Sequence, residues 1–98
     1  MSDLVLHLRS CYFREVAAGT KTEEFRLPTP YWKKRLINRC IDRVVIWDAY
    51  KPRSPETVLE FPWRGVVPRV ITHEHFGHEP VVVFAIQLEQ NQKETRIK

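Results

Sequence analysis

A lysine, two glutamates and an arginine lie within six residues of one another, shortly after a glycine. They are Lys21, Glu23, Glu24 and Arg26, and the glycine is Gly19. In a β-strand, Glu24 and Arg26 point to the same face, because side chains alternate with a period of two. Lys21 reaches that face only from a turn or bulge, which Gly19 can supply because it tolerates positive φ. The spacing therefore predicts a Lys–Glu–Arg cluster.

Three interpretations fit this cluster. A lysine beside apolar walls can act as a base or nucleophile, because burial disfavours its charged form, whereas a nearby carboxylate keeps it charged. The cluster is therefore a proton-transfer site, or a clamp for phosphate groups and base edges. The third interpretation is a solvated hairpin edge, where the charges pair with one another and only brace the sheet.

Aromatic and basic residues are interleaved in three other segments. They are Tyr31-Trp32-Lys33-Lys34-Arg35, Tyr50-Lys51 and Trp63-Arg64. Nucleic-acid sites combine cations for phosphate with rings on which bases stack, at about 1–3 kcal/mol per stacked base. Trp32 has helical spacing with Leu36, so we expect it to face the core. Trp63 follows Pro62 at a predicted turn and is the better candidate for an exposed stacking ring.

The segment from Thr72 to Glu79 contains three histidines and two glutamates. Its spacing matches none of the strong zinc patterns and no cysteine is nearby, so we expect no metal. A loop that supplies polar groups to a pocket is the favoured interpretation. In that loop Glu74 or Glu79 is a possible general base, and His73 or His75 can titrate near neutrality.

The positive charge of the chain is concentrated in its middle. The net charge is +4, and residues 26–53 hold eight Lys and Arg against two Asp, so the rest of the chain is net acidic. Such a distribution is expected for a phosphate-facing surface, or for a solvated helix face that maintains solubility. No serine nucleophile elbow, phosphate-binding glycine loop or dinucleotide fingerprint is present, which disfavours those enzyme classes and their cofactors.

Length and composition favour one small cytosolic domain. A chain of 98 residues with 43% apolar content can build one modest core. We expect residues 1–89 to form this domain and the polar residues 90–98 to fray. No apolar run approaches the roughly 20 residues of a membrane span, and no secretory signal is recognisable. The two isolated cysteines, Cys11 and Cys40, are typical of a reducing cytosol.

Two helices and five to six strands are expected to position these residues. Strands are predicted at residues 4–8, 42–50, 58–61, 66–72 and 80–88, with 44–47 central and Pro68 marking an edge or bulge. The first helix begins with Ser10 as N-cap and ends at Gly19. The second has Thr29 as N-cap and Pro30 at its first position, and its apolar stripe is Trp32, Leu36 and Ile37. The order β-α-β-α-β-β-β suggests an α+β fold with a small, mostly closed sheet or barrel.

One charged motif and three further segments, in this order, resemble the ASCH domains, a branch of the PUA-like superfamily. Gly19-x-Lys21-x-x-Glu24-x-Arg26 is similar to their G-x-K-x-x-E-x-R signature. The segments Pro30-Tyr31-Trp32-Lys33-Lys34-Arg35-Leu36, Pro62-Trp63-Arg64-Gly65 and Thr72-His73-Glu74-His75-Phe76-Gly77 resemble small single-domain members from bacterial and prophage genomes. The resemblance extends to about Leu88.

This resemblance implies a small, mostly closed PUA-like β-barrel with flanking helices and a cleft lined by the signature residues. PUA-like domains are mainly associated with RNA. One similar group removes the acetyl group of 4-acetylcytidine with a Lys, a Thr and a Glu, and another member is described as a ribonuclease. Lys21 matches that lysine, but Glu24 stands where the group has its threonine. Thr22 would point to the same face of the strand as Glu24, and Glu74 would be the distal carboxylate.

The leading hypothesis is a cytosolic module that binds RNA or a nucleoside without a cofactor. Lys21 and Arg26 would contact phosphate or base edges, Glu24 would accept from a base amine, and Trp63 would stack. The expected surrounding contacts are Lys33, Lys34, Arg35, Arg64, His73 and His75.

The alternative is a hydrolase that uses the same cleft on an acylated cytidine or on RNA. Its catalytic residues would be Lys21 as base, Thr22 as nucleophile, Glu24, and Glu74 as proton shuttle. A third possibility is a regulatory domain, of a kind encoded by mobile elements, that binds a protein partner.

Overall fold

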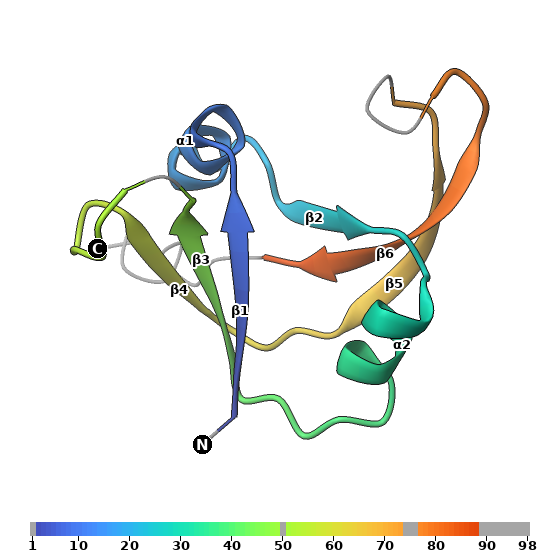
Figure 1. Cartoon of the computed structure of the whole chain (residues 1–98), viewed down its shortest axis with the longest axis horizontal. Helices are drawn as coiled ribbons and strands as arrows, with labels where there is room; N and C mark the ends of the chain where they lie inside the picture. Colours follow the sequence, from blue (N-terminus) through green and yellow to red (C-terminus); the bar gives the residue numbers. More distant parts are fainter. Residues whose placement is uncertain (1, 50, 74–76, 89–98) are drawn as a thin grey trace, which may run out of the picture.

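The computed structural model describes residues 2–49, 51–73 and 77–88, and shows the predicted α+β architecture (Figure 1). These residues form six strands and two helices. In chain order they are β1 (Asp3–Leu8), α1 (Ser10–Ala18), β2 (Glu23–Arg26), α2 (Pro30–Leu36), β3 (Arg43–Asp48), β4 (Val58–Pro62), β5 (Val66–Ile71) and β6 (Val81–Gln87). Four strands follow α2 and match the four predicted ranges, although the predicted order β-α-β-α-β-β-β contained only three.

The strands form two three-stranded sheets. One has the order β1-β3-β4, with β1 parallel and β4 antiparallel to β3. The other has the order β2-β6-β5 and is antiparallel throughout. The central position of β3 and the edge position of β5, which contains Pro68, confirm both predictions. A closed barrel is not confirmed, because β1 and β2 do not pair within the described residues.

The two sheets are separate, and the chain connects them directly between β4 and β5. Strand β4 leads into β5 through only three residues, Trp63 to Gly65, so the chain bends from one sheet directly into the next (Figure 1). On the other side each sheet ends in a strand that lacks a second partner among the described residues, β1 in one sheet and β2 in the other. The gap between these two edges is where a ligand site can form.

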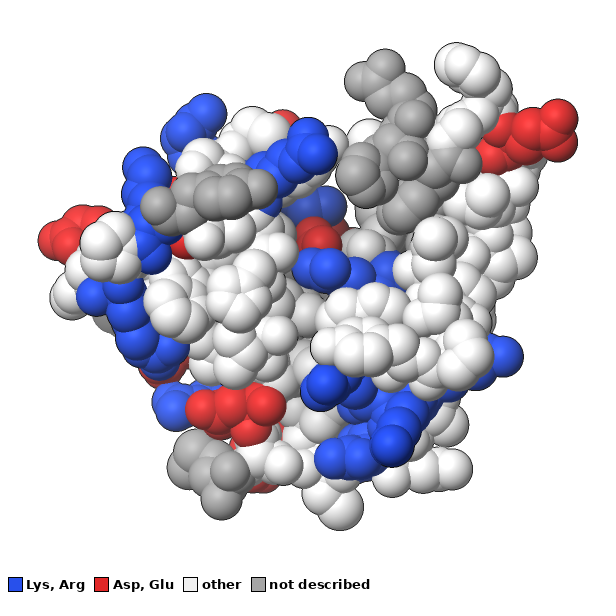
Figure 2. Space-filling view, viewed as in Figure 1, with Lys and Arg blue, Asp and Glu red and all other residues white. Residues whose placement is uncertain are grey.

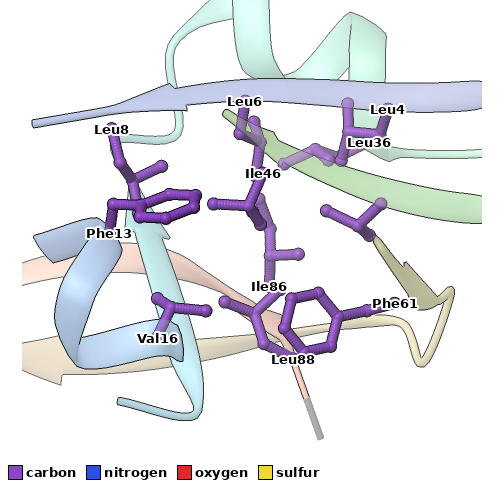
Figure 3. Close-up of a cluster of buried hydrophobic side chains, with 11 residues drawn as sticks. Leu4, Leu6, Leu8, Phe13, Val16, Leu36, Ile46, Phe61, Ile86 and Leu88 are labelled. Carbon is purple, nitrogen blue, oxygen red and sulfur yellow. The ribbon is translucent and has the colours of Figure 1, made fainter. Parts of the chain in front are cut away.

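The core fills the space between the two sheets and α1 (Figure 3). In β1 every second side chain is buried, as the strand period requires when one face is covered. The buried cluster consists of Leu4, Leu6, Leu8, Phe13, Val16, Leu36, Val44, Ile46, Phe61, Ile86 and Leu88. Because the cluster includes residues of both helices and both sheets, it fixes their relative positions.

The helix ends show which capping predictions were correct. Thr29 Oγ1 accepts a hydrogen bond from the backbone N–H of Trp32 at 3.3 Å, with Pro30 at the first position of α2, as predicted. The N-cap of α1 is Arg9 rather than Ser10. The Ser10 hydroxyl instead donates to the buried Asp48 carboxylate at 2.6 Å, because a buried carboxylate needs hydrogen-bond donors.

The predicted apolar stripe of α2 is only partly correct. Leu36 is buried and Trp32 is half-buried, but Ile37 is exposed. The helix ends at Leu36, and Ile37 has extended backbone angles, so its side chain no longer follows the helical period.

Candidate functional site

An open cleft of about 680 Å³ lies between the β1 end of one sheet and the β2 edge of the other. Figure 2 shows charged atoms of both signs gathered in a hollow on this face. The lining residues come from the end of β1, from α1, from β2 and the segment before it, from the start of α2, and from the segment after β5. They are His7, Leu8, Arg9, Tyr12, Glu15, Thr20, Lys21, Thr22, Glu23, Glu24, Phe25, Arg26, Leu27, Thr29, Trp32 and His73.

The turn before β2 brings Lys21 to the cleft. Gly19 ends α1 with φ of +83°, which reverses the chain after the helix. The backbone carbonyl of Glu15 then accepts from the N–H groups of Thr20 and Lys21, at 3.1 and 3.2 Å. It also accepts from the Thr20 hydroxyl at 3.1 Å. These bonds hold the lysine at the start of the strand, as the position of the glycine predicted.

Glu24 joins the two cations of the cluster. Lys21 Nζ lies 3.5 Å from Glu24 Oε1, and Arg26 Nη2 lies 2.9 Å from Glu24 Oε2. Glu24 is buried, and the Lys21 and Arg26 side chains are about one-fifth exposed. The predicted shared face of Glu24 and Arg26 is confirmed. The charges do pair with one another, but they do so inside the cleft rather than on a solvated hairpin edge.

Three aromatic rings surround these cations. Lys21 Nζ lies 4.9 Å from the ring centre of Phe25 and 5.7 Å from that of Tyr12. The Arg26 guanidinium carbon lies 5.0 Å from the ring centre of Trp32. All three rings line the cleft. The site therefore offers flat apolar surface directly beside charged hydrogen-bonding groups.

One buried donor of the charged cluster has no hydrogen-bond partner among the described residues. Arg26 Nε is buried, and none of the described residues accepts from it. Buried donors are nearly always paired, and leaving one unpaired costs about 1–3 kcal/mol. An acceptor that reached this buried atom would remove the cost, so Arg26 retains one unused hydrogen bond.

Among the described lining residues, basic and acidic side chains are equal in number. They are Arg9, Lys21 and Arg26, and Glu15, Glu23 and Glu24. Hydrogen bonds from Arg69 and, less strongly, from Gln87 hold the pKa of the Glu23 carboxyl below its usual value of 4.5. Because the charges are balanced, the cleft is not specific for anions. It can bind ligands that both donate and accept hydrogen bonds.

The structure gathers some of the predicted site residues and places others elsewhere. Lys21, Thr22, Glu24, Arg26 and His73 all line the cleft. Three basic residues of α2, Lys33, Lys34 and Arg35, are exposed and do not line it. Two residues between the sheets are also outside it: Trp63 is half-buried against the core, and Arg64 is exposed.

The histidine-rich segment is only partly described. Glu74 and His75 lie outside the described residues, whereas His73 is half-buried and His78 and Glu79 are exposed. Within residues 2–49, 51–73 and 77–88, no group of three or more His, Cys, Asp or Glu side chains could hold a metal ion.

Sequence reasoning missed the aromatic walls. The helical spacing of Trp32 predicts a core position, and both Trp32 and Tyr12 do pack against the core. Large rings are rarely covered on all sides, and here the remaining surface of each ring faces the cleft. Phe25 alternates with Glu24 and Arg26 along the chain, and this alternation was the available signal that an aromatic ring flanks the charged groups of this strand.

The chain matches no family model, no curated protein and no solved structure. None of the helices in the described part of the chain is both long and apolar enough to cross a membrane. The contacts in the cleft are therefore the basis for any functional conclusion.

Proposed function

We propose that the protein binds RNA or a nucleoside by taking a nucleobase into the cleft. The observation that carries this proposal is the convergence of Lys21, Glu24 and Arg26 with three aromatic rings around one cavity. A nucleobase has flat apolar faces and a polar edge that both donates and accepts hydrogen bonds. The cleft offers matching groups of each kind.

Each part of the cluster has a role in this proposal. The rings of Tyr12, Phe25 and Trp32 provide stacking surface, which is worth about 1–3 kcal/mol per base. Arg26 Nε donates to an acceptor on the base, since it lacks another partner in the described structure. Glu24 retains free lone pairs and accepts from a base amine. Stacking is thus assigned to rings in the cleft rather than to Trp63, which lies outside it.

The basic face of α2 contacts the RNA backbone. In Figure 2 Lys and Arg side chains gather around α2, and Lys33, Lys34 and Arg35 are all exposed. Exposed cations of this kind bind phosphates and accelerate association at low salt. The cleft would then select the base while α2 attracts the strand.

The proposal includes membership of the ASCH domains. Its support is the Gly19-x-Lys21-x-x-Glu24-x-Arg26 motif, whose charged residues lie together in the cleft. In this assignment the two sheets are halves of a PUA-like barrel that is open between β1 and β2. A cytosolic location is part of the same proposal, supported by two exposed free thiols, Cys11 and Cys40.

Binding titrations test the proposal. A labelled single-stranded RNA of about ten nucleotides and the four ribonucleosides are titrated with the protein at low and moderate salt. We expect binding that Lys21→Ala weakens at least tenfold, with RNA affinity falling as salt rises. The matched control is Lys51→Ala, which removes a lysine outside the cleft. Undetectable binding of every probe at low salt would overturn the proposal.

A hydrolase acting on 4-acetylcytidine is the second candidate, because Thr22 lines the cleft beside Lys21. In its neutral form, Lys21 would take the proton of the Thr22 hydroxyl, and the threonine oxygen would attack the acetyl carbonyl. The C–N bond would break with proton transfer to the cytidine nitrogen, and water would then release acetate from the threonine ester. Turnover that both Lys21→Ala and Thr22→Ala abolish supports this enzyme, whereas binding without turnover supports a module.

A further inference from the structure

Strand β2 has one backbone edge that no other described strand covers. Leu88 donates its N–H to the Thr22 carbonyl at 2.9 Å, and the same register pairs Glu24 with Ile86. In an antiparallel ladder, successive residues direct their backbone groups to opposite sides. Thr22, Glu24 and Arg26 therefore bond to β6, and the N–H and C=O groups of Glu23 and Phe25 point away from it.

The pairing of β6 with β5 independently checks which residues of β2 bond to β6. Gln87 donates its N–H to the Gly65 carbonyl at 3.1 Å, so the odd-numbered residues of β6 bond to β5. The even-numbered residues of β6 must then bond to β2, as the Leu88 bond requires. Both observations place the backbone groups of Phe25 on the free edge.

This free edge runs along the cleft. All four residues of β2 line the cavity, although alternate residues belong to opposite faces of the strand. A cavity that touches both faces of one strand must pass across its uncovered edge. The N–H and C=O of Phe25 therefore lie side by side at the cleft, next to the ring that contacts Lys21.

We propose that the backbone N–H and C=O of Phe25 bind the polar edge of the base, a step that rests on the proposed function. Backbone donors and acceptors removed from water require partners, and a ligand that fills the cleft would cover these two. A base edge presents an acceptor next to a donor, which matches this pair. Arg26 Nε and Glu24 lie on the same strand and complete the set of contacts.

The short length of this edge favours a base over a peptide strand. A peptide that extends a sheet forms a series of backbone bonds along the edge. Strand β2 has four residues, and only Glu23 and Phe25 direct their groups outward. The turn from α1 precedes it, and the prolines at positions 28 and 30 follow it. One small flat ligand fits this edge, whereas a strand of the usual five to six residues does not.

Amide hydrogen exchange of the whole protein tests the inference. Exchange is measured by NMR with and without each ribonucleoside at about ten times its dissociation constant. We expect exchange at the Phe25 amide to slow about tenfold with the nucleoside that binds, since only the free fraction then exchanges. The amides of Glu24 and Arg26 are internal controls, because β6 already holds them. Protection of Phe25 that rises with protein concentration alone would place a second copy at this edge and overturn the inference.

Two variants at one position provide a second test. Phe25→Pro removes the N–H without breaking a ladder bond, because proline is tolerated on the free side of an edge strand. Phe25→Leu loses the ring and keeps the N–H. We expect Phe25→Pro to bind the nucleoside at least tenfold more weakly than Phe25→Leu; equal affinities would overturn the inference.

The hydrogen-exchange experiment also separates this inference from the proposed function. If a nucleoside shifts the Trp32 indole resonance but leaves exchange at the Phe25 amide unchanged, the cleft binds a base. The proposal that the Phe25 backbone contacts that base is then wrong. If neither nucleosides nor RNA alter any resonance of the cleft, the proposed function itself fails. Because this measurement uses the unmodified chain, it remains decisive even if Phe25→Pro does not fold.

Discussion

At the residue scale, the charge of Glu24 determines the character of the cleft. Its two oxygens contact different cations, Lys21 and Arg26, and its side chain is only 12% exposed. Without this carboxylate, the two positive charges would repel each other. A single carboxylate therefore holds both cations in place at the wall of the cleft.

Replacing this carboxylate by an amide should destabilise the fold. Glu24→Gln keeps the shape of the side chain but leaves two cations beside each other without compensation, so we expect a loss of about 1–3 kcal/mol. Urea unfolding measures the difference. The matched control is Glu60→Gln, because Glu60 pairs with Arg43 on the exposed surface and its loss should matter less. An equal effect of the two variants would show that the cluster is not a stabilising unit.

The residues of this cluster were predictable from sequence, and the rings around it were not. Strand parity alone placed Glu24 and Arg26 together, and Gly19 predicted the turn that admits Lys21. The cleft face of Trp32 depends on which element lies opposite α2, and that is a tertiary relation with no local signal. For the same reason, the pattern around Trp63 could not show that its ring packs against the core.

At the element scale, the left-handed turn at Gly19 connects α1 to the cleft. A β-carbon built at this position would meet no atom within 4 Å, so any cost of substitution is conformational. We expect Gly19→Ala to lower the free energy of unfolding by about 1 kcal/mol, because positive φ is unfavourable for alanine. Gly19→Asn is the control and should cost less, since asparagine tolerates this conformation. Thermal unfolding compares them, and equal losses would contradict the explanation.

A polar bridge ties the edge strand β2 to β5 across β6. Arg69 of β5 lies 2.6 Å from the Glu23 carboxylate, and Gln87 of β6 donates to the same oxygen at 3.0 Å. These bonds lower the pKa of Glu23 in the folded protein, whereas the unfolded chain has the usual value. The bridge therefore stabilises the fold above that usual value, and its contribution is lost as the pH falls through the lower folded pKa.

The pH dependence of unfolding tests this bridge. As the pH falls from about 5 towards 3, the unfolded state takes up the Glu23 proton first, so the wild-type protein loses stability. Glu23→Gln cannot take up this proton, and its stability should fall less steeply. Asp3, whose pKa is lowered chiefly by the hydrogen bond from Arg43, still contributes to the remaining slope. Urea unfolding at pH 6 and pH 3.5 measures both slopes, and parallel slopes would rule the bridge out.

The elements themselves were largely predictable because their ends carry local signals. Gly19 ends α1, Thr29 and Pro30 begin α2, and Pro68 marks an edge strand; each of these effects acts within a few residues. Which strands become neighbours is not local. Strand β2 pairs with β6, which lies about 60 residues further along the chain, and no turn between them fixes that choice.

At the scale of the whole molecule, the cleft exists because the two sheets do not close on each other. The prediction of an α+β fold followed from the order of elements, and the six strands confirm it. Whether β1 and β2 pair depends on how the core spaces the two sheets. In the structure β1 and β2 remain apart within the described residues, and the charged cluster occupies the opening. The site is thus a consequence of the incomplete closure.

The separation of the cleft from the basic face of α2 predicts two independent components of RNA binding. In the double variant Lys33→Gln/Lys34→Gln, two exposed cations outside the cleft are lost. We expect the slope of log affinity against log salt for single-stranded RNA to decrease by about 1.4, at roughly 0.7 per lost phosphate contact. Nucleoside affinity should stay unchanged, because the cleft and its rings are intact.

The matched control for this variant removes the same charge from the β3–β4 loop. Lys51→Gln/Arg53→Gln changes the net charge equally, and neither residue lines the cleft. If general attraction by the +4 chain were responsible, both double variants would reduce the slope alike. A decrease confined to the α2 variant would show that RNA follows one defined path, from the basic face of α2 into the cleft at β2.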